Sequence, residues 1–402
     1  MNNNPAKIYK RDLFDQIKPY FKSKEIIAIT GSRQVGKTTL LKMIFNTYFK
    51  KKKCLFLTFE NRSDLEIFDT DIENFKKLYC QSYQAIFIDE FQYAKEAGQK
   101  LKYLYDTTSV KFFITGSSSL EIKETGKFLV GRVFSFYLSP FSFSEYLRVI
   151  DQPVFKIVKP YFDMLNNILS SSDIDFYDLV KSQVLQKKLQ NYFEQYLIFG
   201  GYPRVVLAQS EQEKIQVLSS IIDNYLLREI RSLLHLATEN ELLNLARFLS
   251  LQSANLISFS ELSTSTGLSF KELKKHLQIL QQTLVIDLLY PYYHNRRTEI
   301  VKNPKVFFLD NGFRNKVIDN FSKLANRSDG GALAENFVFN SLKISGSKIN
   351  FWRTKSQAEV DFVIEQAGQI IPLEVKYAPL GRKVIGKSLF SFINKYHPQK
   401  AI

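Results

Sequence analysis

Residues 31–41, GSRQVGKTTLL, directly follow the strand-like run EIIAIT (25–30). Their spacing matches G-x-x-x-x-G-K-[ST], the Walker A loop, which requires a strand before it and a helix after it. Backbone N–H groups and the helix N-terminus of such a loop can surround phosphate oxygens. We therefore predict that Lys37 reaches the β- and γ-phosphates of ATP and that Thr38 ligates Mg²⁺. The residues expected to contact the nucleotide are Gly31, Ser32, Arg33, Gln34, Val35, Gly36, Lys37, Thr38 and Thr39.

A second motif, AIFIDE (85–90), ends in two acids. Its four apolar residues predict a buried strand, after which Asp89 would hold Mg²⁺ through water. Glu90 would polarise the attacking water. Kinases and small GTPases usually lack this second acid, so the pair favours hydrolysis of ATP over phosphoryl transfer to another substrate.

The strand-like run KFFITG (111–116) is followed by three serines. A sensor of the γ-phosphate is expected at this edge of the sheet, and Ser117 is the residue we predict for it. A helix cap is the alternative role of a serine-rich strand end.

The first 140 residues alternate strand and helix signals, which predicts an α/β fold with a parallel sheet covered on both faces. From residue 141 to 251 the periodicity is mainly helical, as in the helical lid of an ATPase. The strand-like runs are EIIAIT (25–30), CLFLTF (54–59), AIFIDE (85–90), KFFITG (111–116) and FSFYL (134–138).

Two Ser-x-x-Glu capping boxes, in SFSEL (258–262) and SFKEL (269–273), predict two short helices separated by a three-residue turn. Two strand-like runs around the polar turn HNRR follow them, and this order predicts a winged helix. Leucines at i, i+4 and i+7 of the second helix predict a buried stripe. The residues expected to meet DNA are Lys271, Lys274, Lys275 and Gln278 on that helix and Arg296 and Arg297 at the wing tip. In the alternative interpretation this module only packs against the rest of the chain.

The segment AEVDFVIEQAGQIIPLEVKYA (358–378) matches Asp-x₁₂-Glu-x-Lys, the core pattern of PD-(D/E)xK nucleases, with Val360 in the place of the nominal proline. In a strand, Glu374 and Lys376 share one face. Asp361 and Glu374 would bind Mg²⁺, and Lys376 would orient water or stabilise charge on a phosphate. Glu335 would add another acid. Plain ion pairing is the alternative, and we expect a vestigial or tightly gated site.

The stretches LVGRVFSFYLSPFSFSEYL (129–147) and YLIFGGYPRVV (196–206) complete a resemblance. With the Walker motifs, the chain resembles the AAA-type P-loop ATPases of bacteria and archaea. The C-terminal half of these proteins is a domain of unknown function that contains a winged helix and a restriction-endonuclease-like fold.

The resemblance implies further site residues. Arg132 would be an arginine finger that reaches a neighbouring subunit, with a salt-bridged surface arginine as the alternative. Gly201 and Pro203 would lie near the adenine, with Arg204 as a lid sensor. Ring-forming relatives imply a homo-oligomer, and the expected form is a hexamer.

Composition narrows the class of partner. Lys and Arg number 55 against 40 Asp and Glu, a net charge of +15, which favours a polyanionic partner, DNA first and anionic lipid second. The two cysteines, Cys54 and Cys80, exclude a disulfide framework. The sequence has no run of eighteen apolar residues and no apolar leader at its start, so we expect a cytoplasmic protein without a membrane span.

The leading hypothesis is an ATP- and Mg²⁺-dependent motor that remodels or translocates duplex or branched DNA. The alternatives are an ATP-gated metal-dependent nuclease and a signalling NTPase switch that binds a protein partner. The predicted domains are the ATPase core (1–140), the helical lid (141–251), the winged helix (252–325) and the nuclease-like domain (326–402). A linker is expected at NRSDGGA (326–332).

Overall fold

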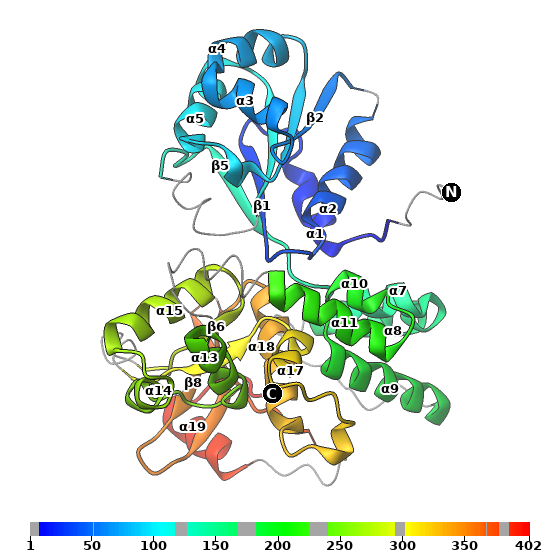
Figure 1. Cartoon of the computed structure of the whole chain (residues 1–402). Helices are drawn as coiled ribbons and strands as arrows, with labels where there is room; N and C mark the ends of the chain where they lie inside the picture. Colours follow the sequence, from blue (N-terminus) through cyan, green and yellow to red (C-terminus); the bar gives the residue numbers. More distant parts are fainter. Residues whose placement is uncertain are drawn as a thin grey trace. The chain divides into compact units, whose positions relative to one another are not determined.

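In the computed structural model, the chain forms two compact units (Figure 1). The N-terminal unit comprises Met1–Phe141 and Gln282–Leu284, and the C-terminal unit comprises Ser142–Gln281 and Val285–Ile402. The residues that the structure describes are 8–50, 52–116, 127–166, 182–224, 240–293, 302–366, 368–377 and 386–402.

A five-stranded sheet forms the middle of the N-terminal unit, in the order β2-β3-β4-β1-β5 with all neighbours parallel. This confirms the parallel sheet predicted from the five strand-like runs. Because β4 lies between β1 and β3, the loops that follow these three strands leave the same edge of the sheet side by side. The strands are β1 (Ile26–Thr30), β2 (Cys54–Thr58), β3 (Ala85–Asp89), β4 (Lys111–Gly116) and β5 (Val133–Tyr137).

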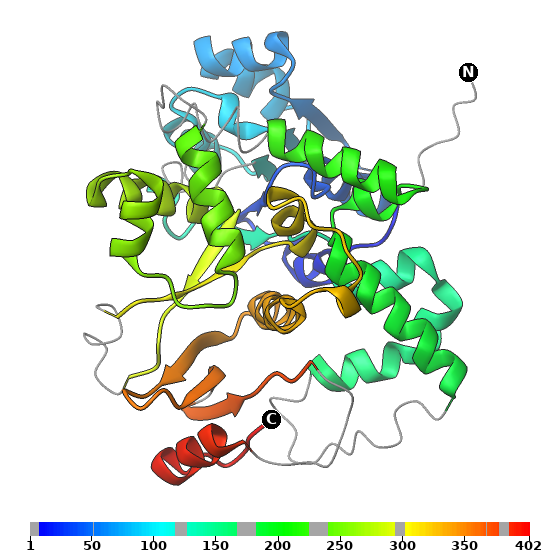
Figure 2. The ribbon, with the colours of Figure 1, turned by 60° about the horizontal axis from the view of Figure 1, so that its bottom comes forward.

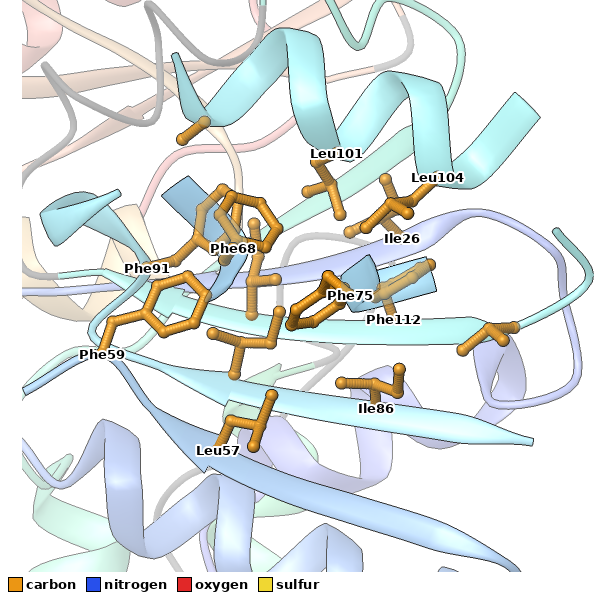
Figure 3. Close-up of a cluster of buried hydrophobic side chains, with 14 of the residues drawn as sticks. Ile26, Leu57, Phe59, Phe68, Phe75, Ile86, Phe91, Leu101, Leu104 and Phe112 are labelled. Atoms are coloured by element: carbon orange, nitrogen blue, oxygen red, sulfur yellow. The ribbon is translucent and has the colours of Figure 1, made fainter. Parts of the chain in front are cut away.

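Apolar side chains alternate between the two faces of this sheet, and each face has its own core. On one face, Ile86 belongs to the same buried cluster as Leu101 of α5 (Figure 3). On the other face, the rings of Phe87 and Phe113 stack 4.4 Å apart, and both contact Phe49. Much of the high phenylalanine content is therefore core packing. The helices of this unit are α1 (Asp12–Ile17), α2 (Lys37–Ile44), α3 (Arg62–Thr70), α4 (Ile72–Phe75) and α5 (Ala97–Thr107).

The C-terminal unit begins with helices, as predicted for residues 141–251. A capping box starts the first of them, because Ser142 Oγ accepts from the Glu145 N–H (3.2 Å) and Glu145 Oε2 accepts from the Ser142 N–H (3.0 Å). In the described parts of the chain, no helix has the length and apolarity needed to cross a bilayer. These helices are α7 (Phe143–Ile150), α8 (Gln152–Asn166), α9 (Gln183–Phe199), α10 (Pro203–Val206), α11 (Glu211–Ile222) and α13 (Asn240–Leu251).

Helices α14 (Phe259–Thr266) and α15 (Phe270–Gln282) come next, three residues apart, and an antiparallel hairpin of β6 (Ile286–Leu289) and β7 (Lys305–Phe308) follows them. Ser269 and Glu272 form the predicted capping box of α15, with hydrogen bonds of 2.9 and 3.4 Å. The order of two helices and then a hairpin is the predicted one, and the assignment as a winged helix stays a prediction. The DNA-binding role of this module stays a prediction.

A three-stranded antiparallel sheet, in the order β10-β9-β8, completes the C-terminal unit. Helix α18 packs against both β7 and β8, and α19 packs on β9 (Figure 2). The side chain of Asn336 on α18 accepts from Phe308 N and donates to Phe308 O of β7, both at 2.8 Å. The hairpin and this sheet therefore belong to one packed body. The elements are α17 (Asn311–Val317), α18 (Gly330–Ile344), β8 (Lys348–Arg353), β9 (Glu359–Gln366), β10 (Gln369–Leu373) and α19 (Lys387–Tyr396).

The segment 326–332, predicted as a linker, is tied to the elements on both sides of it. Asp329 pairs with Arg314 (2.5 Å) and with Arg327 (2.8 Å), and both arginine side chains are buried. Hydrogen bonds from the two guanidinium groups lower the pKa of Asp329, although its partial burial opposes this. Polar side chains in this stretch therefore hold α17 to the start of α18. The division of the chain into four domains stays a prediction.

Candidate functional site

The predicted Walker A loop connects β1 to α2, and two of its glycines are required by geometry. Gly36 has φ of +96°, a left-handed conformation that side chains rarely adopt. At Gly31, an added Cβ would lie 2.4 Å from the carbonyl oxygen of Leu138, which follows β5. The loop can therefore close against the neighbouring strand only with glycine at this position.

Arg11 supports the same loop from the N-terminal segment. Its buried guanidinium donates to the carbonyl oxygens of Val35 (2.8 Å) and Ser139 (2.7 Å) and lies over the ring of Phe141. It thus joins the Walker A loop to the chain after β5. The sequence analysis missed this residue, because nothing in its local pattern indicates a partner 24 or 128 residues away.

Two predicted nucleotide ligands, Lys37 and Thr38, begin α2. The buried Lys37 amine donates to the carbonyl oxygens of Gly31 (3.1 Å) and Ser32 (3.0 Å) within the loop. Thr38 Oγ1 donates to Asp89 Oδ2 at 2.7 Å across 51 residues of sequence. The structure thus brings the two predicted Mg²⁺ ligands together, beside the amine expected to contact the phosphates.

Thr115, near the end of β4, is a second site residue that was not predicted from the sequence. Its hydroxyl donates to Asp89 Oδ1 and accepts from the Glu90 N–H (3.1 Å), and it is fully buried. It therefore fixes both acids at the end of β3. A polar residue near the end of an otherwise apolar central strand was the available signal. Ser117, predicted as the sensor, lies outside the described residues.

Glu90 is held in an unusual conformation. Its φ of 54° places it in the left-handed region, which costs free energy in a residue with a side chain and is common at functional sites. Gln92 Nε2 donates to Glu90 Oε2. The carboxylate predicted to polarise water thus makes a hydrogen bond to an amide of its own chain.

Arg132 lies just before β5, at the edge of the sheet opposite to the Walker A loop. Its guanidinium pairs with Asp106 of α5 at 2.8 and 3.3 Å. The hydrogen bond from Arg132 lowers the pKa of Asp106. Because β5 runs parallel to β1 for five residues at about 3.3 Å each, Arg132 cannot reach the nucleotide site of its own subunit. The contact agrees with the surface ion-pair alternative, and a role in a neighbouring subunit stays a prediction.

The GGYP motif (200–203) makes a tight turn between α9 and α10 in the C-terminal unit. Gly201 N donates to the buried Asp310 at 2.7 Å, and a Cβ on Gly200 would lie 2.2 Å from the same carboxylate. Burial raises the pKa of Asp310 to about 6, against the hydrogen bonds that it accepts from backbone N–H groups. The glycines are therefore explained by packing against Asp310, the N-cap of α17. Adenine contact by Gly201 and Pro203, and the sensor role of the exposed Arg204, stay predictions.

Helix α15 has the two faces that its sequence predicts. Leu273, Leu277 and Leu280 are buried at 0–2% exposure. The ammonium of Lys274 lies 4.5 Å from the ring centre of the half-exposed Phe270. Arg296 and Arg297 lie outside the described residues. The exposed polar residues of this helix include Lys271, Lys274, Lys275 and Gln278.

The nuclease-like residues lie in one region. Asp361 lies in β9, as predicted, but Glu374 and Lys376 lie outside the predicted second strand. β10 ends at Leu373, and the next residue, Glu374, donates its N–H to the carbonyl oxygen of Ile402. Asp361 Oδ2 accepts the Val375 N–H at 2.7 Å, which ties the chain after β10 to β9. The expectation that LEVKYA (373–378) continues the strand is therefore wrong for residues 374–377, and Ala378 lies outside the described residues.

The predicted metal ligands of this region have other partners. Glu374 forms an ion pair with Lys376, and Glu335 contacts Lys305. Burial raises the pKa of Glu335 to about 7, with repulsion from Asp361 adding to it and Lys305 opposing it. Among the residues that the structure describes, His, Cys, Asp and Glu form no group of three or more that could hold a metal ion.

Comparison with known families gives three matches along the chain. A family described as an AAA domain matches residues 23–147. Two domains of unknown function, DUF8612 and DUF4143, match residues 190–324 and 330–402. Together with the Walker A loop and the acids after β3, the first match shows a P-loop ATPase domain of the AAA type in the N-terminal part of the chain.

Two proteins of Methanocaldococcus jannaschii are similar along most of the chain. The uncharacterized protein MJ1544 is 26% identical over 370 residues, which cover 89% of this chain and 75% of that protein. The uncharacterized protein MJ1637 is 23% identical over 296 residues, which cover 71% of this chain and 61% of that protein. Neither name specifies an activity.

Solved structures give weaker similarities. A Walker-type ATPase of Pyrococcus abyssi superposes with a TM-score of 0.49 at 14% identity, covering 77% of this chain and 96% of that chain. AMPPCP-bound DnaA from Aquifex aeolicus gives a TM-score of 0.27 at 12% identity, covering 67% and 86%. At these scores the superpositions carry no inference about function.

The contacts of Thr115 generate the first prediction. Thr115→Val keeps the shape but removes the donor to Asp89 and the acceptor for the Glu90 N–H. We expect ATP turnover to fall at least about tenfold, since a lost buried hydrogen bond costs about 1–3 kcal/mol, while ATP affinity changes by less than about threefold. Steady-state turnover and equilibrium binding of ATP measure the two effects. Thr107→Val, on the exposed end of α5, is the control, and equal turnover in both variants would contradict the assignment.

Proposed function

We propose that the protein is an ATP-hydrolysing motor that acts on DNA, with ATP turned over in the N-terminal unit and DNA bound by the C-terminal unit. The observation that carries the ATPase part is the hydrogen-bonded set Thr38–Asp89–Thr115–Glu90. It joins the start of α2 to the ends of β3 and β4. A single edge of the sheet thus offers a phosphate-binding loop, a metal-binding pair and a candidate base.

Each of these residues has a distinct task when ATP binds. Lys37 would exchange the carbonyl oxygens of Gly31 and Ser32 for phosphate oxygens, and Thr38 and Asp89 would hold Mg²⁺ with the phosphates as further ligands. The ion would neutralise charge on the phosphates. Glu90 would accept a proton from the attacking water after Gln92 releases its carboxylate.

This division of tasks separates binding from turnover. We expect Lys37→Ala to abolish ATP binding, because the amine contacts phosphates in the ground state. Glu90→Gln should bind ATP normally but lose at least about a hundredfold in turnover, because only the reaction of water needs the carboxylate. Equilibrium binding and single-turnover hydrolysis separate the two effects. Wild-type hydrolysis by Glu90→Gln would refute the assignment.

DNA binding is proposed from the surface of α15. The leucine stripe fixes the orientation of this helix, so Lys271, Lys274 and Lys275 remain exposed beside the aromatic ring of Phe270. Lysines at such positions neutralise phosphates, whereas an aromatic face can stack on an unpaired base. The net charge of +15 adds a general attraction for a polyanion. Duplex or branched DNA is therefore the proposed partner.

Salt dependence tests this surface. Lys271, Lys274 and Lys275 changed together to Ala should weaken DNA binding and flatten the slope of log affinity against log salt by about 1 per lysine, because fewer counterions are released. Fluorescence anisotropy with duplex and branched DNA at several salt concentrations measures the slope. The charge-matched control changes the exposed Lys18, Lys53 and Lys77 to Ala. Equal slopes in the two triple variants would rule out α15 as the contact.

A homo-oligomer, with a hexameric ring as its most concrete form, is proposed from the position of Arg132. The guanidinium lies away from the nucleotide site of its own subunit and is partly exposed. It could therefore contact the nucleotide site of a neighbouring subunit. Breaking the ion pair with Asp106 would free it. A guanidinium supplied by a neighbour would stabilise charge as the γ-phosphate leaves.

Mixed oligomers test this arrangement. Arg132→Ala should leave ATP affinity nearly unchanged and lower turnover by about 10³-fold, as for arginine fingers. Mixing it with inactive Lys37→Ala subunits should restore turnover, because Lys37→Ala subunits can supply the arginine to Arg132→Ala sites. Asp106→Ala, which frees Arg132 without removing it, is the control. An absence of rescue in mixtures, with a monomeric mass by light scattering in the presence of ATP, would eliminate the ring.

The described residues give no particular support to the alternative of a metal-dependent nuclease, because their His, Cys, Asp and Glu side chains form no group of three or more that could hold a metal ion. Among the described residues, no contact favours the alternative of a signalling switch over a motor that acts on DNA.

A further inference from the structure

Lys305 is a buried lysine at the start of β7. It is 2% exposed, and its amine lies 2.6 Å from Glu359 Oε1 on β9 and 3.4 Å from Glu335 Oε2 on α18. Burying an ammonium is costly unless it is paired. The hairpin therefore places a positive charge among the acids of another sheet, in an ion pair that joins three elements.

The negative charges of the acids around the Lys305 amine are largely offset by nearby cations. Glu359 Oε2 also accepts from Arg353 at 2.9 Å, so two cations share one carboxylate. Burial lowers the pKa of Lys305, but the nearby Glu335 and Glu359 carboxylates outweigh it, and the net pKa is raised. The amine thus stays protonated at neutral pH. Asp361 is the third acid whose charge acts on it.

A divalent metal ion does not fit this arrangement. Mg²⁺ requires near-octahedral oxygen ligands, and an ammonium already lies against two of these carboxylates. Glu335 and Glu359 contact Lys305, Asp361 accepts the Val375 N–H, and Glu374 pairs with Lys376. With Lys305 in place, the acids in the ranges that the structure describes form no group of three or more that could hold a metal. The predicted Mg²⁺ role of Asp361 and Glu374 therefore disagrees with the geometry.

We propose that Lys305 is the resident cation of the Glu335–Glu359–Asp361 carboxylate cluster, where it holds β7 to α18 and β9 and keeps divalent metal ions out. An ammonium satisfies the same negative charge that a metal would, and it is covalently part of the chain, so no ion in solution can compete at ordinary concentrations. The hairpin and the sheet are thereby locked together. This role is independent of ATP hydrolysis and of DNA binding.

Substitution of this one amine should convert the cluster into a metal site. Lys305→Met keeps the length of the side chain and removes its charge. In the nucleotide-free full chain, we expect Lys305→Met to bind about one more Mn²⁺ ion than wild type, with an affinity at least tenfold above any wild-type site in this unit. Electron paramagnetic resonance counts free and bound Mn²⁺. The added ion should be lost in Lys305→Met/Asp361→Asn, and Mn²⁺ should raise the thermal midpoint of Lys305→Met only.

The controls separate this role from general charge effects and from misfolding. Lys348→Met removes a lysine from an exposed ion pair with Glu365 on the same sheet, and it should bind no additional Mn²⁺. If Lys305→Met does not fold, Lys305→Met/Glu359→Gln removes one charge of each sign and should recover the fold and also bind no added Mn²⁺. The wild-type titration then decides: Mn²⁺ bound to wild type and lost in Asp361→Asn overturns the proposal. A folded Lys305→Met that gains no Mn²⁺ overturns it equally.

Discussion

The hydrogen bond of 2.7 Å between Thr38 and Asp89 is the contact around which the N-terminal unit is organised. It closes only because β4 lies between β1 and β3, so that the loops after these strands leave one edge of the sheet together. Thr115, at the end of the intervening strand, completes the contact by bonding the second oxygen of Asp89. The strand order is thus what brings together the side chains of the candidate nucleotide site.

The two units are stabilised in different ways. The sheet of the N-terminal unit is packed on both faces by aromatic and aliphatic side chains, and the polar groups of the candidate nucleotide site gather at one of its edges. Buried polar groups join the elements of the C-terminal unit instead: Asn336 binds both backbone groups of Phe308, Arg314 reaches Asp329, and Lys305 reaches Glu359. Such contacts add less stability than apolar packing of the same volume, but they favour one arrangement of neighbouring elements.

Sequence patterns predicted what local spacing encodes. The Walker A loop, the five strands, the leucine stripe of α15 and the capping box of Ser269 all depend on neighbours within a few residues, and all are found in the structure. Contacts between distant residues left no such signal. Lys305 drew no prediction, because its partners Glu335 and Glu359 are distant in the sequence, and Asp329 was assigned to a linker although Arg314 and Arg327 both hold it. The strand after Leu373 was predicted from alternation alone, whereas the backbone of Glu374 bonds to Ile402.

The described contacts also bear on how turnover would be controlled. Lys37 is satisfied by carbonyl oxygens of its own loop, and the carboxylate of Glu90 accepts from Gln92. ATP must replace the first set of bonds to bind, and water must replace the second for hydrolysis. Under the proposed function, the two exchanges involve different residues, one at the start of α2 and the other after β3. Each exchanged hydrogen bond is worth about 1 kcal/mol, which is enough to slow turnover severalfold without preventing it.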